Sequence, residues 1–327
     1  MDFKVNVEHD GDINILQITD MQIIDANQRR FPDRIDGWKL TEWVPEKNDV
    51  NLYSHIKYLV KETKPDLIII TGDIIYGEFD DNGSSFVEFT EFMDSLEIPW
   101  APVYGNHDNE SYKGIDWQCE QFENAKYALF KRGNVFGNGN YTVGIYQNGE
   151  LKRVLFMMDS NGCARINITD GFRDDQLAWI KEQSLKIHKT NPDVPFFICC
   201  HIPTRDFSDA YISAGYQKEH DESPEKFADY ELGKDIPSKP GDFGRKRENV
   251  THSKQVILPL LKECGFDGFF AGHYHVVNTS IMYEGIRFTF GLKTGYYDYY
   301  DEEANGGTLI ALSGKDFSVK HIPYAAK

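Results

Sequence analysis

Five apolar runs in this 327-residue chain are each followed at once by side chains that can bind a metal ion or move a proton. The segments read ILQITD, LIIITGD, WAPVYGNHD, PFFICCH and GFFAGHYH. The side chains after the runs are Asp20, Asp73, Asn106, His107, Asp108, His201, His273 and His275. Carboxylate, amide and imidazole groups without a thiolate suit iron, manganese, zinc or cobalt better than calcium. The set exceeds the needs of one tetrahedral ion and is about enough for two ions that share a carboxylate.

The apolar runs are rich in β-branched and aromatic residues, which predicts buried strands. We expect strands at 13–19, 67–70, 100–104, 153–158, 195–200, 268–271, 286–290 and 308–312. Apolar residues at helical spacing predict helices at 51–64, 84–96, 174–189 and 253–265, the last ending at Gly265. Alternating strands and helices indicate an α/β fold, in which ligands bind beyond the carboxyl ends of strands. The dispersed side chains are therefore expected to converge.

Each of these side chains has an ordinary structural explanation when it is considered alone. An aspartate after a strand is often a helix cap, and a single histidine there is often a structural residue. The Gly105-Asn106 pair is also typical of a turn. Five coincidences at the same end of predicted strands favour a shared site instead.

Composition limits the partners of the chain. With 35 basic and 52 acidic residues, the net charge is −17, which disfavours nucleic acid and anionic membranes. Five cysteines without a CxxC pair do not indicate a disulfide framework. We find no apolar leader and no apolar span of about 20 residues. We therefore expect a cytoplasmic protein without a membrane span, with an extracellular location as the alternative if a signal peptide has been removed.

The ordered blocks D-x-Q, GD-x-x-Y, GNHD, H and GH-x-H resemble the calcineurin-like metallophosphoesterase superfamily. The resemblance extends from Asp20 to His275, and its motif pattern is most similar to that of purple acid phosphatase-like phosphatases. It implies an α/β fold with four layers, an α/β/β/α sandwich of two mixed sheets flanked by helices. We interpret residues 1–327 as one such domain, with a charged insertion at about 210–252 that is either a lid or a solvated surface segment.

The resemblance also implies a role for each matching residue. Asp73 is expected to bridge two metal ions drawn from iron, manganese and zinc. Asp20 and His275 would hold the first ion, while Asn106, His201 and His273 would hold the second. His107 would be the general acid, and we group Asp108 with it as catalytic.

The first block departs from the common pattern, which has histidine where this chain has Gln22. An amide is a poorer ligand than imidazole, so either the first metal site is weak or another group replaces the missing ligand. Tyr76 is a candidate, because purple acid phosphatases bind ferric iron through a tyrosine at the corresponding position of GD-x-x-Y. The alternative is that Tyr76 is a packed aromatic residue beside Phe79.

We expect a dinuclear metal-dependent phosphoesterase that hydrolyses phosphate esters by attack of a metal-bound hydroxide, with a phosphomonoesterase favoured. One alternative is a phosphodiesterase acting on cyclic nucleotides or phospholipid head groups. Another is a non-catalytic binding scaffold with a degraded metal site. The expected partner is a small phosphorylated substrate or a phosphoprotein, and Arg165 and Arg205 are candidate phosphate-binding residues.

Overall fold

All of the expected strands are present in the computed structural model, which describes residues 1–25, 35–37, 39–163, 168–215, 235–236, 239–244 and 253–324. They are β2 (Ile13–Ile18), β3 (Leu67–Thr71), β4 (Trp100–Val103), β6 (Glu150–Met157), β9 (Phe196–Cys199), β12 (Phe266–Ala271), β14 (Ile286–Phe290) and β15 (Gly306–Ser313). Most of their residues are buried, which explains why an apolar run was a sufficient signal.

Several further strands lie beside these and were not expected. They are β1 (Phe3–Val7), β5 (Tyr141–Gln147), β7 (Asn161–Cys163), β8 (Ile168–Asp170), β10 (Asp235–Ile236), β11 (Lys239–Phe243), β13 (Ser280–Tyr283) and β16 (Asp316–Pro323). Strands β1 and β16 lie at the edges of their sheets and expose every second residue or more. Their polar residues therefore hide them from a search for apolar runs.

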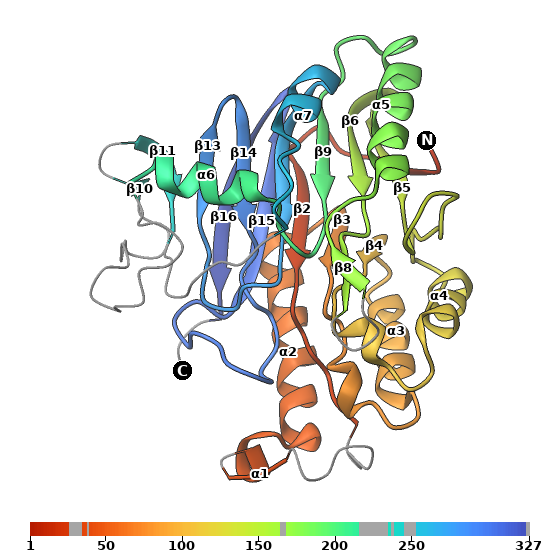
Figure 1. The fold of residues 1–327 in the computed structure, drawn as a ribbon, viewed down its shortest axis with the longest axis vertical. Helices are drawn as coiled ribbons and strands as arrows, with labels where there is room; N and C mark the ends of the chain where they lie inside the picture. Colours follow the sequence, from red (N-terminus) through yellow and green to blue (C-terminus); the bar gives the residue numbers. More distant parts are fainter. Residues whose placement is uncertain are drawn as a thin grey trace.

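Apart from the two-stranded sheet β7-β8, the described strands form two large mixed sheets (Figure 1). One has the order β1-β5-β6-β9-β12-β14-β13-β11-β10, and the other has the order β16-β15-β2-β3-β4. Strands β2, β3 and β4 are parallel neighbours, as are β6, β9, β12 and β14. The parallel core of each sheet thus brings several carboxyl ends to one edge.

Helices cover the outer face of each sheet. They are α2 (Pro45–Thr63), α3 (Ser84–Ser95), α4 (Ile115–Asn124), α5 (Asp174–His188), α6 (Arg205–Ser213) and α7 (Leu258–Cys264), whereas the short α1 (Lys39–Glu42) buries no residue. Along β9, Phe197 and Cys199 join the core that both sheets share with α2, α3 and α4, whereas Phe196 and Ile198 join the core under α5, α6 and α7. This alternation gives four layers and confirms the predicted α/β/β/α sandwich.

Helix α7 begins later than the expected range of 253–265. Pro259 lies in its first turn, and the Asp206 carboxylate accepts hydrogen bonds from the backbone N–H groups of Ile257 and Leu258. A proline favours the first turn, and a carboxylate satisfies the unpaired N–H groups there, so the helix starts at Leu258. Gly265 ends it in the left-handed conformation, as expected.

The charged segment at about 210–252 lies largely outside the described residues. Residues 210–213 complete α6, and β10 and β11 extend the edge of the nine-stranded sheet. Among the helices that the structure describes, none combines the length and the apolar composition that crossing a membrane requires.

Leu16 in β2 offers a test of this packing. Its side chain is fully buried near Leu59 of α2, since both lie beside Gly307. We expect Leu16→Ala to lower the free energy of unfolding by about 2–5 kcal/mol, because it leaves a cavity between helix and sheet. Leu185→Ala is the matched control, because that leucine is 58% exposed on α5 and should change the stability by less than about 0.5 kcal/mol. The free energies of unfolding are measured by urea denaturation, and an equal decrease for the two variants would contradict this packing.

Candidate metal centre

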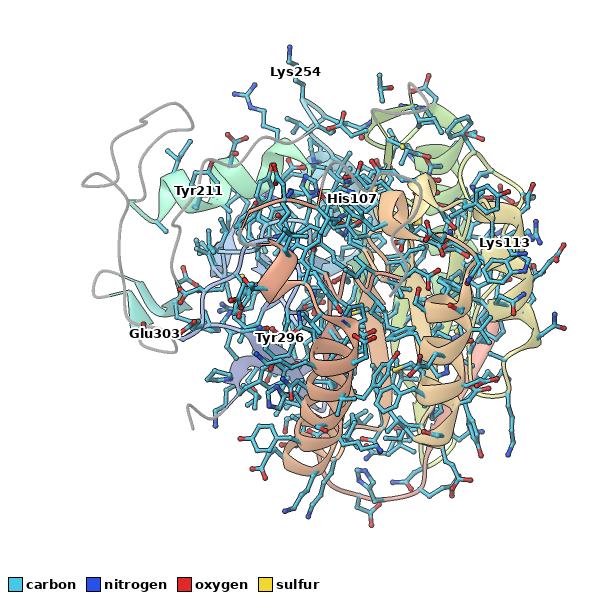
Figure 2. All side chains as sticks on the ribbon, turned by 90° about the horizontal axis from the view of Figure 1, so that it is seen from below. His107, Lys113, Tyr211, Lys254, Tyr296 and Glu303 are labelled. Carbon is cyan, nitrogen blue, oxygen red and sulfur yellow. The ribbon has the colours of Figure 1, made fainter. Side chains whose placement is uncertain are left out.

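The predicted site residues come together where strands of both sheets end. Asp20 follows β2, Asp73 follows β3, and Asn106 follows β4 in the five-stranded sheet. His201 follows β9 and His273 follows β12 in the nine-stranded sheet. Figure 2 views this end of the molecule, with His107 near its middle.

Four of the residues here adopt the left-handed backbone conformation, which is uncommon for residues other than glycine. The φ angles are 53° at Asp20, 50° at Gln22, 51° at Asp73 and 78° at His273. Each such residue costs on the order of 1–3 kcal/mol, and such strain clusters at functional sites. The turns that follow β2, β3 and β12 are therefore built to direct these side chains inward at the expense of stability.

Two glycines allow the strands to approach each other at this point. A Cβ atom on Gly105 would lie 2.1 Å from Oδ1 of Asp73, and one on Gly272 would lie 2.1 Å from Oγ1 of Thr19. Neither position has room for a side chain, so glycine is required by close approach rather than by an unusual φ angle.

The centre of the site is formed by Asp73, His201 and His273, whose ligand atoms all lie within 4.8 Å of one another. Nε2 of His201 is 3.2 Å from Oδ2 of Asp73 and 3.3 Å from Nδ1 of His273. The amide oxygen of Asn106 is also 3.2 Å from Nε2 of His201. Nδ1 of His201 lies 2.7 Å from the carbonyl oxygen of Thr71, which fixes the ring and leaves Nε2 facing the centre.

Asp20 and His275 form a second pair beside this group. Oδ2 of Asp20 accepts hydrogen bonds from the Thr19 hydroxyl and from the backbone N–H of His273. Oδ1 is buried, makes no hydrogen bond with the described residues and lies 3.4 Å from Nε2 of His275. A buried carboxylate oxygen without a hydrogen bond is costly, so this atom has the properties of a ligand.

The carboxylates and imidazoles here shift one another's pKa values. Burial lowers the pKa of His201, but attraction to Asp73 and Asp20 outweighs burial and raises it to about 9. Burial raises the pKa of Asp73, but His201 and His107 outweigh burial and hold it well below its ordinary range. Burial, with repulsion from His201, lowers the pKa of His273 to about 3. The site thus combines ionised carboxylates with one charged and one neutral imidazole.

His107 lies beside the centre without joining the convergent group. Its backbone N–H donates to Oδ1 of Asp73, and its Nδ1 lies 2.7 Å from Oε2 of Glu110. The side chain of His107 is partly exposed, and its ring packs against Tyr76. Glu110 was not among the predicted site residues. Its position three residues after His107, the candidate general acid, could have indicated this contact.

The catalytic role predicted for Asp108 does not agree with its placement. Its carboxylate accepts hydrogen bonds from the backbone N–H groups of Ile74, Ile75 and Gly105. The side chain is fully buried, so it fixes the two loops that carry Asp73 and Asn106 instead of facing a substrate. We correct its role to that of a positioning residue.

Gln22 points its two amide atoms at different neighbours. Oε1 accepts a hydrogen bond of 2.8 Å from Nζ of Lys293, and Nε2 lies 3.4 Å from Oδ2 of Asp73. Lys293 also donates to the carbonyl oxygen of Asp20 at 3.0 Å. Nothing in the segment GLKTGYY marked this lysine, because the contact spans about 270 residues of sequence.

Tyr76 packs in an aromatic cluster. Its ring centroid lies 4.4 Å from that of His107, 5.0 Å from that of Phe79 and 5.6 Å from that of Trp43. These contacts match the alternative of a packed aromatic residue, and they place the ring against His107.

Of the two candidate arginines, only Arg205 belongs to the part of the chain that the structure describes, and it lies on the surface. Arg205 begins α6, is 57% exposed and lies 3.8 Å from Asp209 in an exposed ion pair. Arg165 lies outside the described residues.

The donor set suits metal ions. Asp73, Asn106, His201 and His273 present oxygen and nitrogen atoms to one point, and Oδ1 of Asp20, which makes no hydrogen bond with the described residues, lies beside it with Nε2 of His275. Borderline divalent ions prefer such a mixed set. A purely structural role for Asp20 would not explain why its buried Oδ1 lacks a hydrogen bond, whereas a role as a metal ligand would.

Comparison with known proteins gives a family match over most of the chain. The family model described as calcineurin-like phosphoesterase matches residues 13–277. A dimetal phosphatase from Danio rerio is similar in structure, with 12% identity, a TM-score of 0.49, and coverage of 97% of this chain and 100% of that one.

Two curated relatives differ in how much of each protein aligns. Phosphatase DCR2 of Saccharomyces cerevisiae is 28% identical over 184 residues, which cover 49% of this chain and 30% of that protein. Probable inactive purple acid phosphatase 28 of Arabidopsis thaliana is 25% identical over 324 residues, covering 89% of this chain and 72% of that protein. The match thus spans less than a third of the yeast protein and nearly three quarters of the plant protein.

The raised pKa of His201 predicts that metal binding releases a proton. At pH 7 the ring carries a proton because its pKa is about 9, and an ion can bind Nε2 only after that proton leaves. The apparent metal affinity should therefore rise from pH 7 towards pH 9, by at most about tenfold per pH unit, and then level off. Calorimetric titration in two buffers of different ionisation enthalpy measures the released proton. His9→Gln is a control at an exposed histidine that pairs with Asp66 before β3, at the opposite end of this strand from Asp73, and no proton release at pH 7 would contradict the prediction.

Proposed function

Because this chain belongs to the calcineurin-like phosphoesterase family, we propose that it is a metal-dependent phosphoric ester hydrolase that acts on phosphomonoesters. The observation that carries the proposal is the convergence of Asp73, His201 and His273 beside the partly exposed His107. A purely structural site would not require the partly exposed imidazole of His107 next to buried ligand atoms.

We assign two metal subsites to the donor groups. Asp20, Asp73 and His275 would hold the first ion, and Asp73, Asn106, His201 and His273 would hold the second. When bound, such ions polarise a phosphoryl group and lower the pKa of water. Iron, manganese and zinc all suit the donor set, and the residues do not select among them.

His107 is assigned the role of general acid. Burial lowers its pKa, but Asp73 and Glu110 outweigh burial and raise it to about 9, so the imidazole holds a proton at neutral pH. Glu110 accepts a hydrogen bond from Nδ1, which leaves the Nε2–H to donate to the leaving oxygen of a phosphate ester. Asp108 keeps the loop in place through the backbone of Gly105.

The charge of the chain supports a small phosphorylated substrate or a phosphoprotein rather than nucleic acid. A net charge of −17 repels a polyanion along its whole length. A single phosphate group needs only a local positive centre, which His107 and the bound ions would supply.

The second candidate function is a non-catalytic scaffold with a degraded metal site. Two observations favour it: Gln22 stands where the common motif has histidine, and three relatives are named as probable inactive purple acid phosphatases. The two candidates differ in metal content. Bound metal in the purified protein supports the enzyme, and its complete absence after incubation with manganese, zinc and iron supports the scaffold.

The activity test compares p-nitrophenyl phosphate with bis-p-nitrophenyl phosphate after each metal is added back to the stripped protein. We expect the monoester to be hydrolysed faster by tenfold or more with at least one metal, because its dianionic phosphate is attracted to the positive centre more strongly than the monoanionic diester. A preference for the diester would shift the substrate class to phosphodiesters. Activity on neither compound with any metal would argue against the enzyme.

His107→Ala separates acid catalysis from metal binding. We expect the variant to retain the metal content of the parent, because the convergent group does not include His107, and to lose about 10²–10⁴-fold in kcat. His188→Ala is a matched control, since that ring stacks on Phe196 far from the centre. Full activity of His107→Ala with an unchanged metal content would remove His107 from the mechanism.

A further inference from the structure

Lys293 is a buried lysine on the segment that connects the two sheets beside the metal centre. The segment leaves β14 in the nine-stranded sheet and enters β15 in the five-stranded sheet. The side chain of Lys293 is only 1% exposed, and its Nζ donates to the carbonyl oxygen of Asp20 and to Oε1 of Gln22. Burial of a lysine is costly, so this placement needs a reason.

The lysine fixes which way the Gln22 amide points. A lysine side chain can only donate hydrogen bonds here, so the atom of Gln22 that faces it must be the oxygen. The NH₂ group then faces Oδ2 of Asp73 at 3.4 Å. An amide nitrogen with two hydrogens offers no lone pair to a metal ion, so Gln22 cannot bind the ion that Asp73 binds while this arrangement holds.

We propose that Lys293 is a built-in cation of the first metal subsite, which withdraws Gln22 from the ligand set and makes that subsite bind metal more weakly than the second. The inference rests on the proposed metal-dependent function. It assigns Lys293 as a positioning residue that acts through the ligands and leaves Gln22 outside the ligand set, and it makes the second subsite the one that fills first.

The number of donors in each subsite agrees with this order. The second subsite has Asp73, Asn106, His201 and His273, and three of these already converge within 4.8 Å among the described residues. The first subsite shares Asp73 and adds only Oδ1 of Asp20 and Nε2 of His275, which lie outside that group. It lacks one donor and has an ammonium group beside its turn, and like charges repel more strongly where water is excluded.

Lys293 also holds the strained turn that presents Asp20. The two acceptors described above belong to residues in the left-handed conformation, Asp20 and Gln22. The next residue, Thr294, donates its backbone N–H to Thr19 and accepts a hydrogen bond from the Thr19 N–H through its hydroxyl. A variant at Lys293 can therefore loosen the turn, so the test must distinguish a lost turn from a lost charge.

The test is the binding of Mn²⁺ to the full chain, stripped of metal and followed by calorimetry and by metal analysis after gel filtration. We expect the chain to bind two Mn²⁺ ions, the second with a dissociation constant at least tenfold larger than the first. Lys293→Met should narrow the ratio of the two dissociation constants by about tenfold or more, since groups behind the ligands typically change metal affinity 10–100-fold. Lys262→Met is the control, because Lys262 is 50% exposed and pairs with Glu284, and it should leave both constants unchanged.

A second variant keeps the inference testable if Lys293→Met does not fold. Gln22→Leu removes the amide without removing the lysine, whose bond to the Asp20 carbonyl remains. We expect both dissociation constants to stay within about threefold, because the amide is not a ligand. Loss of the weak equivalent in Gln22→Leu would show that Gln22 binds metal and would overturn the inference.

The remaining outcomes separate the inference from the function on which it rests. Two equally tight equivalents in the parent protein would overturn the inference and leave the metal-dependent function standing. An equal loss at both subsites in Lys293→Met would reduce the lysine to a structural role and also overturn it. No bound metal at all in the parent would contradict the proposed function itself.

Discussion

The burial of two carboxylates at the meeting point of two sheets is the constraint on which the site depends. Asp20 and Asp73 are almost completely buried, and an unpaired buried carboxylate costs several kcal/mol. The surrounding groups supply the compensation: His201 and His275 as imidazoles, the backbone N–H groups of His107 and His273, and the ammonium of Lys293 behind the turn. The groups around Asp20 and Asp73 are therefore hydrogen-bond donors or cations, as two buried carboxylates require.

The same constraint explains why the backbone is strained where the ligands lie. A side chain at the end of a strand points along or out of the sheet unless the chain turns sharply, and the left-handed conformation at Asp20, Asp73 and His273 provides that turn. Non-glycine residues pay for it with stability, which the fully buried strands on either side can supply. Glycine is placed where the neighbouring chain comes too close for a Cβ atom, as at Gly105.

Much of the fold and the ligand set could be predicted, because both follow from local patterns. Buried parallel strands read as apolar runs, and Asp73 and His201 follow directly after such runs. The edge strand β16 contains no apolar run and was missed for that reason, although its alternation of polar and apolar residues is itself a signal of a half-exposed strand. Lys293 and the orientation of Gln22 were also beyond reach, since they depend on a contact between distant segments. Asp108 was misjudged because a carboxylate next to a catalytic histidine looks the same in sequence whether it faces a substrate or the backbone.

The two sheets contribute opposite halves of the ligand set. Asp20, Asp73 and Asn106 follow strands of the five-stranded sheet, and His201, His273 and His275 follow strands of the nine-stranded sheet. An ion held by both halves would act as a reversible crosslink between the two sheets, in addition to their apolar contacts and to the ion pairs His201–Asp73 and His275–Asp20. Neither sheet could then separate from the other without releasing the ion. Binding of the ion and the packing of the two sheets would therefore be linked, so that metal raises the free energy of unfolding and unfolding releases metal.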